Sequence, residues 1–173
     1  KGAIVKVSDE KETNFDTHPI TDLENLDFDF AVVSPGWKPT HPLILALQKK
    51  GIELTNEIDL AWEYRPSGQI WYAITGTNGK TSTTELAATM IKNSIACGNV
   101  GKTVIESITE GHRFLVLELS SFQIHWLRKA QFRAVAILNI ADDHTDWHGS
   151  FENYAAAKIK LLAHSEKIGR AHV

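Results

Sequence analysis

The chain has 173 residues, enough for one to two domains of ordinary size. Apolar residues make up 43% and charged residues 23%, which excludes a disordered or collagen-like chain. The net charge of −3 comes without any block of like charge, so nothing indicates a nucleic-acid or membrane-surface partner. No apolar run approaches the roughly 20 residues of a membrane span. The one cysteine, Cys97, cannot form an internal disulfide, which favours a reducing cytoplasm.

The two ends of the chain look artificial. Position 1 is Lys rather than Met and leads directly into the apolar run 3–7, so we expect a segment upstream of it. Residues 167–173 back-translate to a string that resembles a common sequencing-adapter read, and we set them aside as a suspected scar. We therefore expect the natural protein to continue beyond about Glu166.

Strand-like and helical segments alternate in the first part of the chain. We expect, in order, a strand at 3–7, a strand at 29–33, a helix at 42–50, a short strand at 52–55 and a helix at 57–64. Pro42 suits the first position of a helix, and Gly51 suits the residue after its end. Residues 65–69 (Arg-Pro-Ser-Gly-Gln) are the best linker candidate. The expected organisation is a domain piece at 1–65, a linker at 66–69 and a second piece at 70–166.

The alternation of strands and helices restarts after this linker. We expect strands at 70–75, 114–119 and 134–140, and helices at 80–93 and 151–164. The last two strands are nearly continuous apolar runs, which is typical of a sheet covered on both faces. Strands that alternate with helices predict an α/β fold with a parallel sheet.

The strongest local motif runs from Thr75 to Ser82, Thr-Gly-Thr-Asn-Gly-Lys-Thr-Ser, between a strand and a helix. In that setting backbone N–H groups and the helix dipole can hold phosphate, Lys80 supplies a point charge and the Thr81 hydroxyl can bind Mg²⁺. The general P-loop pattern has glycine where this chain has Ile74, so this is a variant whose first glycine is Gly76. The alternative is a glycine-rich turn with an incidental lysine.

Glu118 stands near the end of the apolar strand at 114–119. Burying a lone carboxylate is costly, so a buried Glu118 needs a partner such as a metal or a bound cation. The alternative is a position at the strand end that is exposed to water.

A segment rich in Asp and His, residues 142–149, directly follows the strand at 134–140. Ligands bind at the carboxyl ends of strands in open α/β sheets, so a Mg²⁺-linked role is one interpretation and a solvated loop is the other. His144 and His148 are four residues apart, which makes a zinc site conceivable. Gly149 and the turn-like composition argue against the two-histidine helix of such a site.

Lys158 lies on the apolar face of the helix expected at 151–164, by the 3.6-residue period. One explanation is an apolar stem that packs on the core while the ammonium reaches water. The functional alternative is a desolvated lysine with a lowered pKa.

Taken in series, these segments resemble the Mur ligase family of ATP-dependent amino-acid ligases. The family forms G-T-x-G-K-[ST], G-N-[IV]-G, D-H-x-D-x-H-G and Y-x-x-A-K correspond to residues 76–81, 98–101, 143–149 and 154–158, and its S-P-G turn to residues 34–36. Residues 117–123, Leu-Glu-Leu-Ser-Ser-Phe-Gln, look like the stretch of the member that adds D-glutamate to UDP-N-acetylmuramoyl-L-alanine. The resemblance spans about residues 3–166.

The resemblance implies the end of a Rossmann-like UDP-binding domain followed by the first part of a P-loop-type parallel-sheet ATPase domain. It implies a bacterial cytoplasmic enzyme of peptidoglycan synthesis, expected to be a monomer, that uses ATP and two Mg²⁺ ions. UDP-N-acetylmuramoyl-L-alanine and D-glutamate would be its substrates, joined through an acyl phosphate. Because the family's amino-acid-binding domain is absent, we expect this chain alone to be inactive.

Residue roles follow from the same resemblance. The nucleotide phosphates would be bound by Gly76, Thr77, Asn78, Gly79, Lys80, Thr81 and Ser82. Thr81 and Glu118 would hold the first Mg²⁺, and His144 would hold the second with Lys158 as a carbamate. Lys80, His144 and Lys158 would be the catalytic residues. Substrate contacts would come from Asn99 and, at the uridine end, from Asp9, Ser34, Pro35 and Gly36.

Three rival interpretations stay open. Another Mur ligase or a folylpolyglutamate synthase would share the phosphate loop and the histidine segment but should lack residues 120–123 as they stand here. A plain P-loop NTPase would not need Lys158 on an apolar face. A non-catalytic nucleotide-binding module is the third, and turnover by the full-length protein would exclude it.

Overall fold

The computed structural model describes residues 3–9 and 27–166, so the suspected scar at 167–173 lies outside the described residues. The chain divides into two compact units, one of residues 1–31 and 37–54 and one of residues 32–36 and 55–173. The second unit therefore includes helix α3 (Glu57–Tyr64), whereas the sequence places the boundary at 66–69. The domain organisation of the protein stays a prediction.

The first unit contains helix α2 (Pro42–Lys49) and most of a two-stranded sheet, β1 (Phe30–Val32) and β2 (Glu53–Thr55). Helix α2 begins as expected, with Pro42 in its first turn and the His41 side chain accepting a hydrogen bond from Leu43 N. The prediction of a strand at 3–7 is wrong, because within these residues only Val7 forms a β-bridge. Ile4 and Val5 are 90% and 74% exposed, so apolar packing does not support a strand there.

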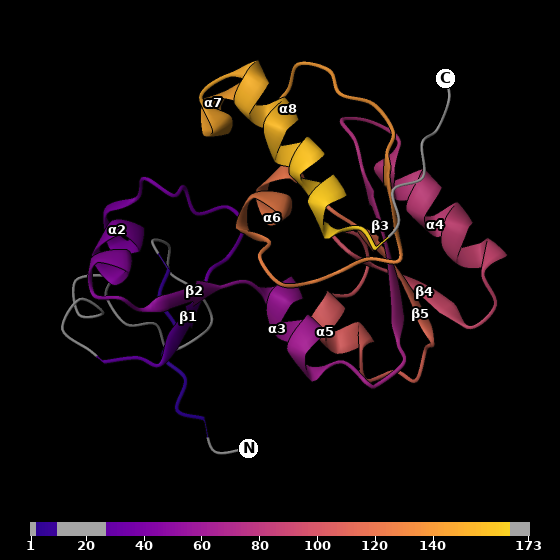
Figure 1. Cartoon of the computed structure of the whole chain (residues 1–173), viewed down its shortest axis with the longest axis horizontal. Coiled ribbons are helices and arrows are strands. Elements are labelled where there is room, and N and C mark those ends of the chain that lie inside the picture. Colours follow the sequence, from indigo (N-terminus) through magenta and orange to yellow (C-terminus); the bar gives the residue numbers. More distant parts are fainter. Residues whose placement is uncertain (1–2, 10–26, 167–173) are drawn as a thin grey trace. The chain divides into compact units, whose positions relative to one another are not determined.

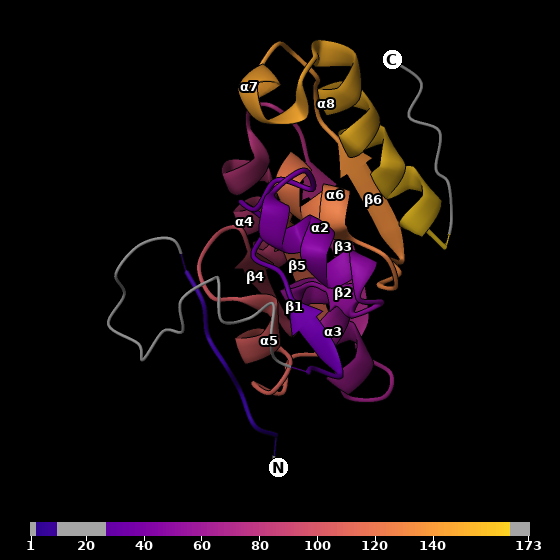
Figure 2. The ribbon, with the colours of Figure 1, turned by 90° about the vertical axis from the view of Figure 1, so that its left-hand side faces the viewer.

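The second unit is built on a parallel four-stranded sheet in the order β4-β5-β3-β6, which Figure 2 shows side by side. The strands are β3 (Ile70–Thr75), β4 (Ser94–Gly98), β5 (Phe114–Glu118) and β6 (Ala134–Ile137). The register places Glu118 beside Ile74 on one neighbouring strand and beside Gly98 on the other. The carboxyl ends of all four strands therefore meet along one edge of the sheet.

Helices cover both faces of this sheet. Figure 1 shows α4 (Lys80–Met90) on one side and α6 (Ser121–Trp126) and α8 (Phe151–Ile159) on the other. The remaining helices are α5 (Val104–Ser107), α7 (Thr145–His148) and the 3₁₀ helix η1 (Lys160–His164). Helix α6 starts with a capping box, in which the Ser120 hydroxyl accepts from Gln123 N and the Gln123 side chain accepts from Ser120 N.

The strand β5 has the double coverage that the sequence predicts, and β6 does not. Leu115, Val116 and Leu117 in β5 are each 0% exposed. In β6, Ala134 and Ala136 are exposed and Val135 is half-buried, so the expectation that its run is covered on both faces is wrong. The reason is position: among the described strands, β6 lies at the edge of the sheet and β5 lies inside it.

Cys97 in β4 is completely buried, and burial raises the pKa of its thiol to about 12. Because the thiolate is the reactive form, we expect a thiol reagent at pH 8 to react on the order of 10³-fold more slowly than with a free cysteine. The measurement is the rate of a disulfide-exchange dye with the folded chain, and with the urea-unfolded chain as control. Rapid labelling of the folded chain would contradict this burial.

Asp59 in α3 connects that helix to the segment between α6 and β6. Its carboxylate is buried and accepts hydrogen bonds from three consecutive backbone N–H groups, those of Arg128, Lys129 and Ala130, at 2.7, 2.9 and 2.8 Å. The Asn56 side chain donates a fourth at 2.7 Å. These bonds fix the chain that enters β6, and so they help to position the residues at its far end.

Asp59→Ala is expected to lower the free energy of unfolding by about 2 kcal/mol, because three backbone N–H groups, the one of Ala130 buried and the other two partly buried, lose a charged acceptor. Urea denaturation of the purified chain measures this loss. Glu63→Ala is the matched control, since Glu63 is on the same helix but is exposed and forms an ion pair with Lys129 at the surface. The control should change stability by about 0.5 kcal/mol or less, and equal losses in both variants would refute the role of Asp59.

Candidate functional site

The predicted phosphate loop joins β3 to α4 at the carboxyl edge of the sheet. Gly79 has a φ of +79°, a conformation that favours glycine, and α4 begins at the next residue, Lys80. The first N–H groups of an α-helix have no partner within the helix, so those of α4 are free of intrahelical bonds and can hold an anion. The strand-loop-helix setting that the sequence predicts is confirmed.

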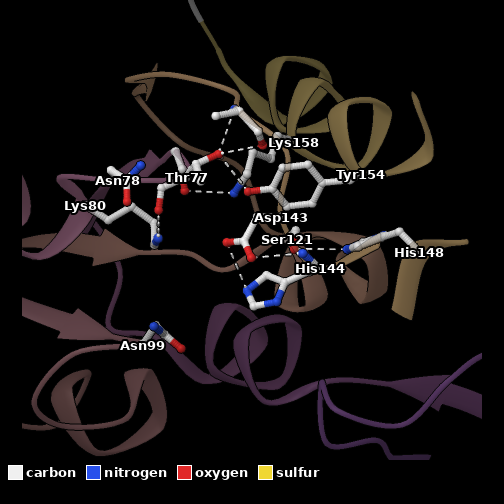
Figure 3. A network of polar contacts seen from close by, with 12 residues as sticks. Thr77, Asn78, Lys80, Asn99, Ser121, Asp143, His144, His148, Tyr154 and Lys158 are labelled. Carbon is white, nitrogen blue, oxygen red and sulfur yellow. Dashed lines mark hydrogen bonds and ion pairs between the residues drawn. The ribbon is translucent and has the colours of Figure 1, made fainter. Parts of the chain in front are cut away.

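The Lys80 side chain folds back over this loop. Its Nζ donates a hydrogen bond to Thr77 O at 2.9 Å, as drawn in Figure 3. A lysine on a flexible stem is a mobile point charge, so the same ammonium can turn from a carbonyl oxygen to a phosphate oxygen at small cost.

Glu118 is buried, with 2% of its surface exposed, and its two oxygens have different partners. The Thr81 hydroxyl donates to Oε2 at 2.7 Å and the Asn99 side chain donates to Oε1 at 2.9 Å. The exposed position considered for Glu118 is therefore wrong. Thr81, Asn99 and Glu118 come from α4, the end of β4 and the end of β5, and they meet beside the phosphate loop.

The close approach of Asn99 to Glu118 depends on the glycine before it. Asn99 N donates to Glu118 O at 2.9 Å, and a Cβ at Gly98 would lie 2.6 Å from that same carbonyl oxygen. Gly98 also has a φ of +98°, which side-chain-bearing residues rarely adopt. The glycine therefore allows β4 to end directly against the Glu118 backbone.

Lys158 points into the protein and not into water. It is 2% exposed, and its Nζ donates to Gly76 O at 2.9 Å and to Thr75 Oγ1 at 3.4 Å. Burial, together with the charge of Lys80, lowers the pKa of Lys158 to about 8. The interpretation of Lys158 as a stem with its ammonium in water is wrong, and the desolvated lysine with a lowered pKa is what the structure has.

His144 lies below this lysine at the start of α7, and Asp143 lies close to both (Figure 3). His144 has a φ of +51°, and its N–H donates to Asp143 Oδ1 at 2.9 Å. Its ring packs against Phe122 of α6, with centroids 4.8 Å apart. Neighbouring His148 has its Nε2 3.0 Å from Ser121 Oγ. These contacts hold the histidine segment in a defined conformation.

Zinc has no support at this segment. Within residues 3–9 and 27–166, no three His, Cys, Asp or Glu side chains come together in a way that could hold a metal ion. Mg²⁺ makes a different demand, because it commonly takes one or two protein oxygens and fills its remaining positions with water and substrate phosphate. The adjacent Thr81 hydroxyl and Glu118 carboxylate are hard oxygen donors of that kind.

The turn at residues 34–36 lies in the same compact unit as the phosphate loop. The Trp147 indole N–H donates to Gly36 O at 3.0 Å, and Pro35 lines a cavity of about 30 Å³ with Gln123 and Trp126. Asp9 belongs to the other unit, so its predicted role stays a prediction.

The sequence alone indicates no individual role for two residues near the loop, Tyr154 and Asn139. Tyr154 OH lies 2.9 Å from Thr77 Oγ1, and Asn139 bonds to the loop backbone. The sequence pattern places Asn139 inside the strand expected at 134–140, but β6 ends at Ile137. A polar residue at the end of an apolar strand was the signal that could have identified it.

A parallel sheet with a lysine-containing loop before a helix, and a buried carboxylate on the neighbouring strand, defines a P-loop-type nucleotide-binding domain. The family model described as the Mur ligase middle domain matches residues 74–173. The chain belongs to the Mur ligase family.

Two curated relatives are similar over most of the chain. The UDP-N-acetylmuramoylalanine–D-glutamate ligase of Thermobifida fusca (strain YX) is 46% identical over 141 residues, 77% of this chain and 30% of that protein. The ligase of the same name from Corynebacterium efficiens is 42% identical over 147 residues, 79% of this chain and 31% of that protein. The chain thus spans less than a third of the length of these relatives.

Solved structures share the fold at lower identity. The UDP-N-acetylmuramate:L-alanyl-gamma-D-glutamyl-meso-diaminopimelate ligase of Neisseria meningitides has a TM-score of 0.53 at 16% identity, over 87% of this chain and 53% of that one. The MurF ligase of Thermotoga maritima, solved in complex with ADP, has a TM-score of 0.50 at 23% identity, over 62% of this chain and 29% of that one. Among the helices that the structure describes, none combines the length and the apolar composition that a membrane span requires.

Proposed function

We propose that the protein joins D-glutamate to UDP-N-acetylmuramoyl-L-alanine at the expense of ATP, in peptidoglycan precursor synthesis. The observation that carries the proposal is the hydrogen-bonded pair of Thr81 and Glu118 beside the loop that bears Lys80. This pair places a hydroxyl and a buried carboxylate where a phosphate-bound divalent cation would lie. The names of the relatives support the choice of D-glutamate as the amino acid.

The reaction has two steps, and charge neutralisation is the main demand of the first. The carboxylate of UDP-N-acetylmuramoyl-L-alanine attacks the γ-phosphorus of ATP, its new O–P bond replaces the bond to ADP, and an acyl phosphate results. The amine of D-glutamate then attacks the acyl carbon, phosphate leaves, and the amide forms after loss of a proton. Lys80 and the first-turn N–H groups of α4 stabilise the phosphate charge in the first step.

Thr81 and Glu118 would hold the first Mg²⁺, which when bound neutralises the phosphates. The Asn99 amide orients the Glu118 carboxylate from the opposite side, in addition to its proposed contact with substrate. The second Mg²⁺ would be held by His144 and by Lys158 as a carbamate. Two observations support a role of Lys158 in this site: its Nζ lies 2.9 Å from the loop carbonyl oxygen of Gly76, and its side chain is buried.

A carbamate forms when a neutral amine adds CO₂, with loss of a proton, so that a positive charge becomes a negative one. Burial and the charge of Lys80 both favour the neutral amine of Lys158. An anion at that position would also be a hard oxygen ligand for a divalent cation. We further propose that residues 34–36 and Asp9 serve the uridine end of the substrate, and that the enzyme is a monomer in the bacterial cytoplasm.

The test is a ligation assay on the full-length protein with ATP, Mg²⁺, UDP-N-acetylmuramoyl-L-alanine and D-glutamate. We expect release of ADP and phosphate that depends on both substrates, together with a product heavier by one glutamyl residue. Replacing D-glutamate by L-glutamate is the matched control and should abolish the product. Equal turnover with another amino acid, or with a folate, would favour a different ligase of the family, and nucleotide binding without turnover would favour a non-catalytic module.

A further inference from the structure

Asn139 follows β6 and bonds directly to the phosphate loop. Its side-chain Oδ1 accepts from Thr77 N at 3.1 Å and from Asn78 N at 2.9 Å, while its Nδ2 donates to Asn78 O at 3.1 Å. Its backbone carbonyl also accepts from Thr77 N, at 3.0 Å. A side-chain amide carries an acceptor and a donor in one plane. The Asn139 side chain therefore bonds to both the backbone N–H and the backbone carbonyl of Asn78.

A second set of bonds fastens the neighbouring loop side chain. The Thr77 hydroxyl donates to Ala141 O at 3.2 Å and accepts from Ala141 N at 3.0 Å. Tyr154 OH lies 2.9 Å from the same hydroxyl, as Figure 3 shows. The first half of the loop is therefore held by the chain after β6 and by α8.

These bonds determine which loop N–H groups remain for a ligand. Those of Thr77 and Asn78 already donate to Asn139. Those of the first turn of α4, from Lys80 to Ser82, lack intrahelical partners because of their position in the helix. The N–H group of Gly79, the residue before this turn, donates to no other residue in the described part of the chain. The loop is divided into a half that is fastened to the protein and a half that can face phosphate.

We propose that Asn139 is a positioning residue that fixes Thr77 and Asn78, and that the nucleotide phosphates take their backbone hydrogen bonds from residues 79–82 alone. The second part rests on the proposed function and assigns the anion-binding groups within that site. It removes the backbone of Thr77 and Asn78 from the phosphate contacts implied by the family resemblance. Asn139 acts on the loop and touches neither substrate.

The experiment measures amide hydrogen exchange by NMR on the 173-residue chain, with and without ADP and Mg²⁺. In the unmodified chain we expect the Thr77 and Asn78 amides to be protected before ADP is added. Addition of ADP should increase protection only at residues 79–82. This comparison tests the assignment of the phosphate contacts within one sample.

Two variants test the positioning role. Asn139→Leu keeps the size of the side chain and removes its side-chain hydrogen bonds, so the Asn78 amide should exchange about tenfold faster and ADP should bind about tenfold more weakly. The Thr77 amide should change less, because it also donates to the Asn139 backbone carbonyl, which the variant keeps. Asn139→Asp keeps the acceptor oxygen, so it should keep the protection of both amides, whereas its negative charge should weaken ADP binding. Thr89→Val, a similar change at the exposed far end of α4, is the control and should alter neither measurement.

The outcomes separate the two parts of the inference. Unchanged exchange at Asn78 in Asn139→Leu would overturn the positioning role, and so would a uniform acceleration over the whole sheet with a lowered melting temperature. New ADP-dependent protection at Thr77 or Asn78 would overturn the assignment of phosphate to residues 79–82. If ADP changed no amide in the unmodified chain, the nucleotide site itself would be refuted, and the exchange data without ADP would still decide the role of Asn139.

Discussion

Lys80→Ala in the full-length protein is expected to lower the rate of ligation about 10²-fold or more, because the first step loses a positive charge at the transferring phosphate. Its ammonium now lies 2.9 Å from Thr77 O, on the loop that would surround the phosphates. The measurement is ADP release at saturating substrates, with the ATP affinity determined separately by titration. Most of the loss should appear in kcat, since the charge that Lys80 stabilises develops during transfer.

Lys92→Ala is the matched control for that loss. Lys92 is exposed and follows the carboxyl end of α4, at the opposite end of the same helix from Lys80. It should leave the rate of ligation unchanged. Lys80→Ala should also retain the melting temperature of the unmodified protein, because the Lys80 side chain is only partly buried. Near-normal turnover by Lys80→Ala would refute the assignment of residues 75–82 as the phosphate loop.

Lys158→Met is expected to abolish ligation to a similar degree, about 10²-fold or more, because methionine cannot carry a carbamate and leaves the second Mg²⁺ without that ligand. Methionine fills a similar buried volume, so the variant should still fold. The assay compares initial rates with and without added bicarbonate. Bicarbonate should not restore the variant, since no amine remains to be modified.

Lys158→Arg separates the carbamate from a simple need for positive charge. A guanidinium stays protonated and forms no carbamate, so this variant should be as inactive as Lys158→Met. If Lys158→Arg kept substantial activity, a cation would be sufficient at this position and the carbamate would be refuted. Melting curves of both variants, followed by circular dichroism, show whether either substitution has disrupted the fold. A disrupted fold would appear as a lowered melting temperature.

Local sequence patterns predicted much of the second unit because its elements have strong local signals. Residues 57–64 and 70–75 form a helix and a strand with the predicted bounds. The loop before Lys80 was recognisable because glycine and lysine stand between an apolar run and a helical one. The sequence also indicates that Glu118 and Lys158 need a partner if they are buried, since a charge on an apolar strand or helix face is costly without one.

Other features depend on contacts that no local pattern contains. The short helices α5, α6 and α7 have four to six residues, too few to show a clear period, and they are fixed by caps and by packing. Neither the bonds of Asn139 to the loop nor those of Asp59 to residues 128–130 can be read from the sequence. Both join segments more than sixty residues apart. Such pairs become visible only when the strand order is known.

The alignment of β3, β4 and β5 limits how this protein can change in length. Gly98 and Glu118 are paired across the sheet, and Ile74, near the end of β3, stands beside Glu118 on the other side. Inserting one residue within β5 would turn its side chains to the opposite faces and bring a leucine to the position of the carboxylate. An insertion in the exposed connection around Gly111 would leave this pairing intact. We therefore expect related sequences to differ in length between these strands and to keep the spacing within each of them.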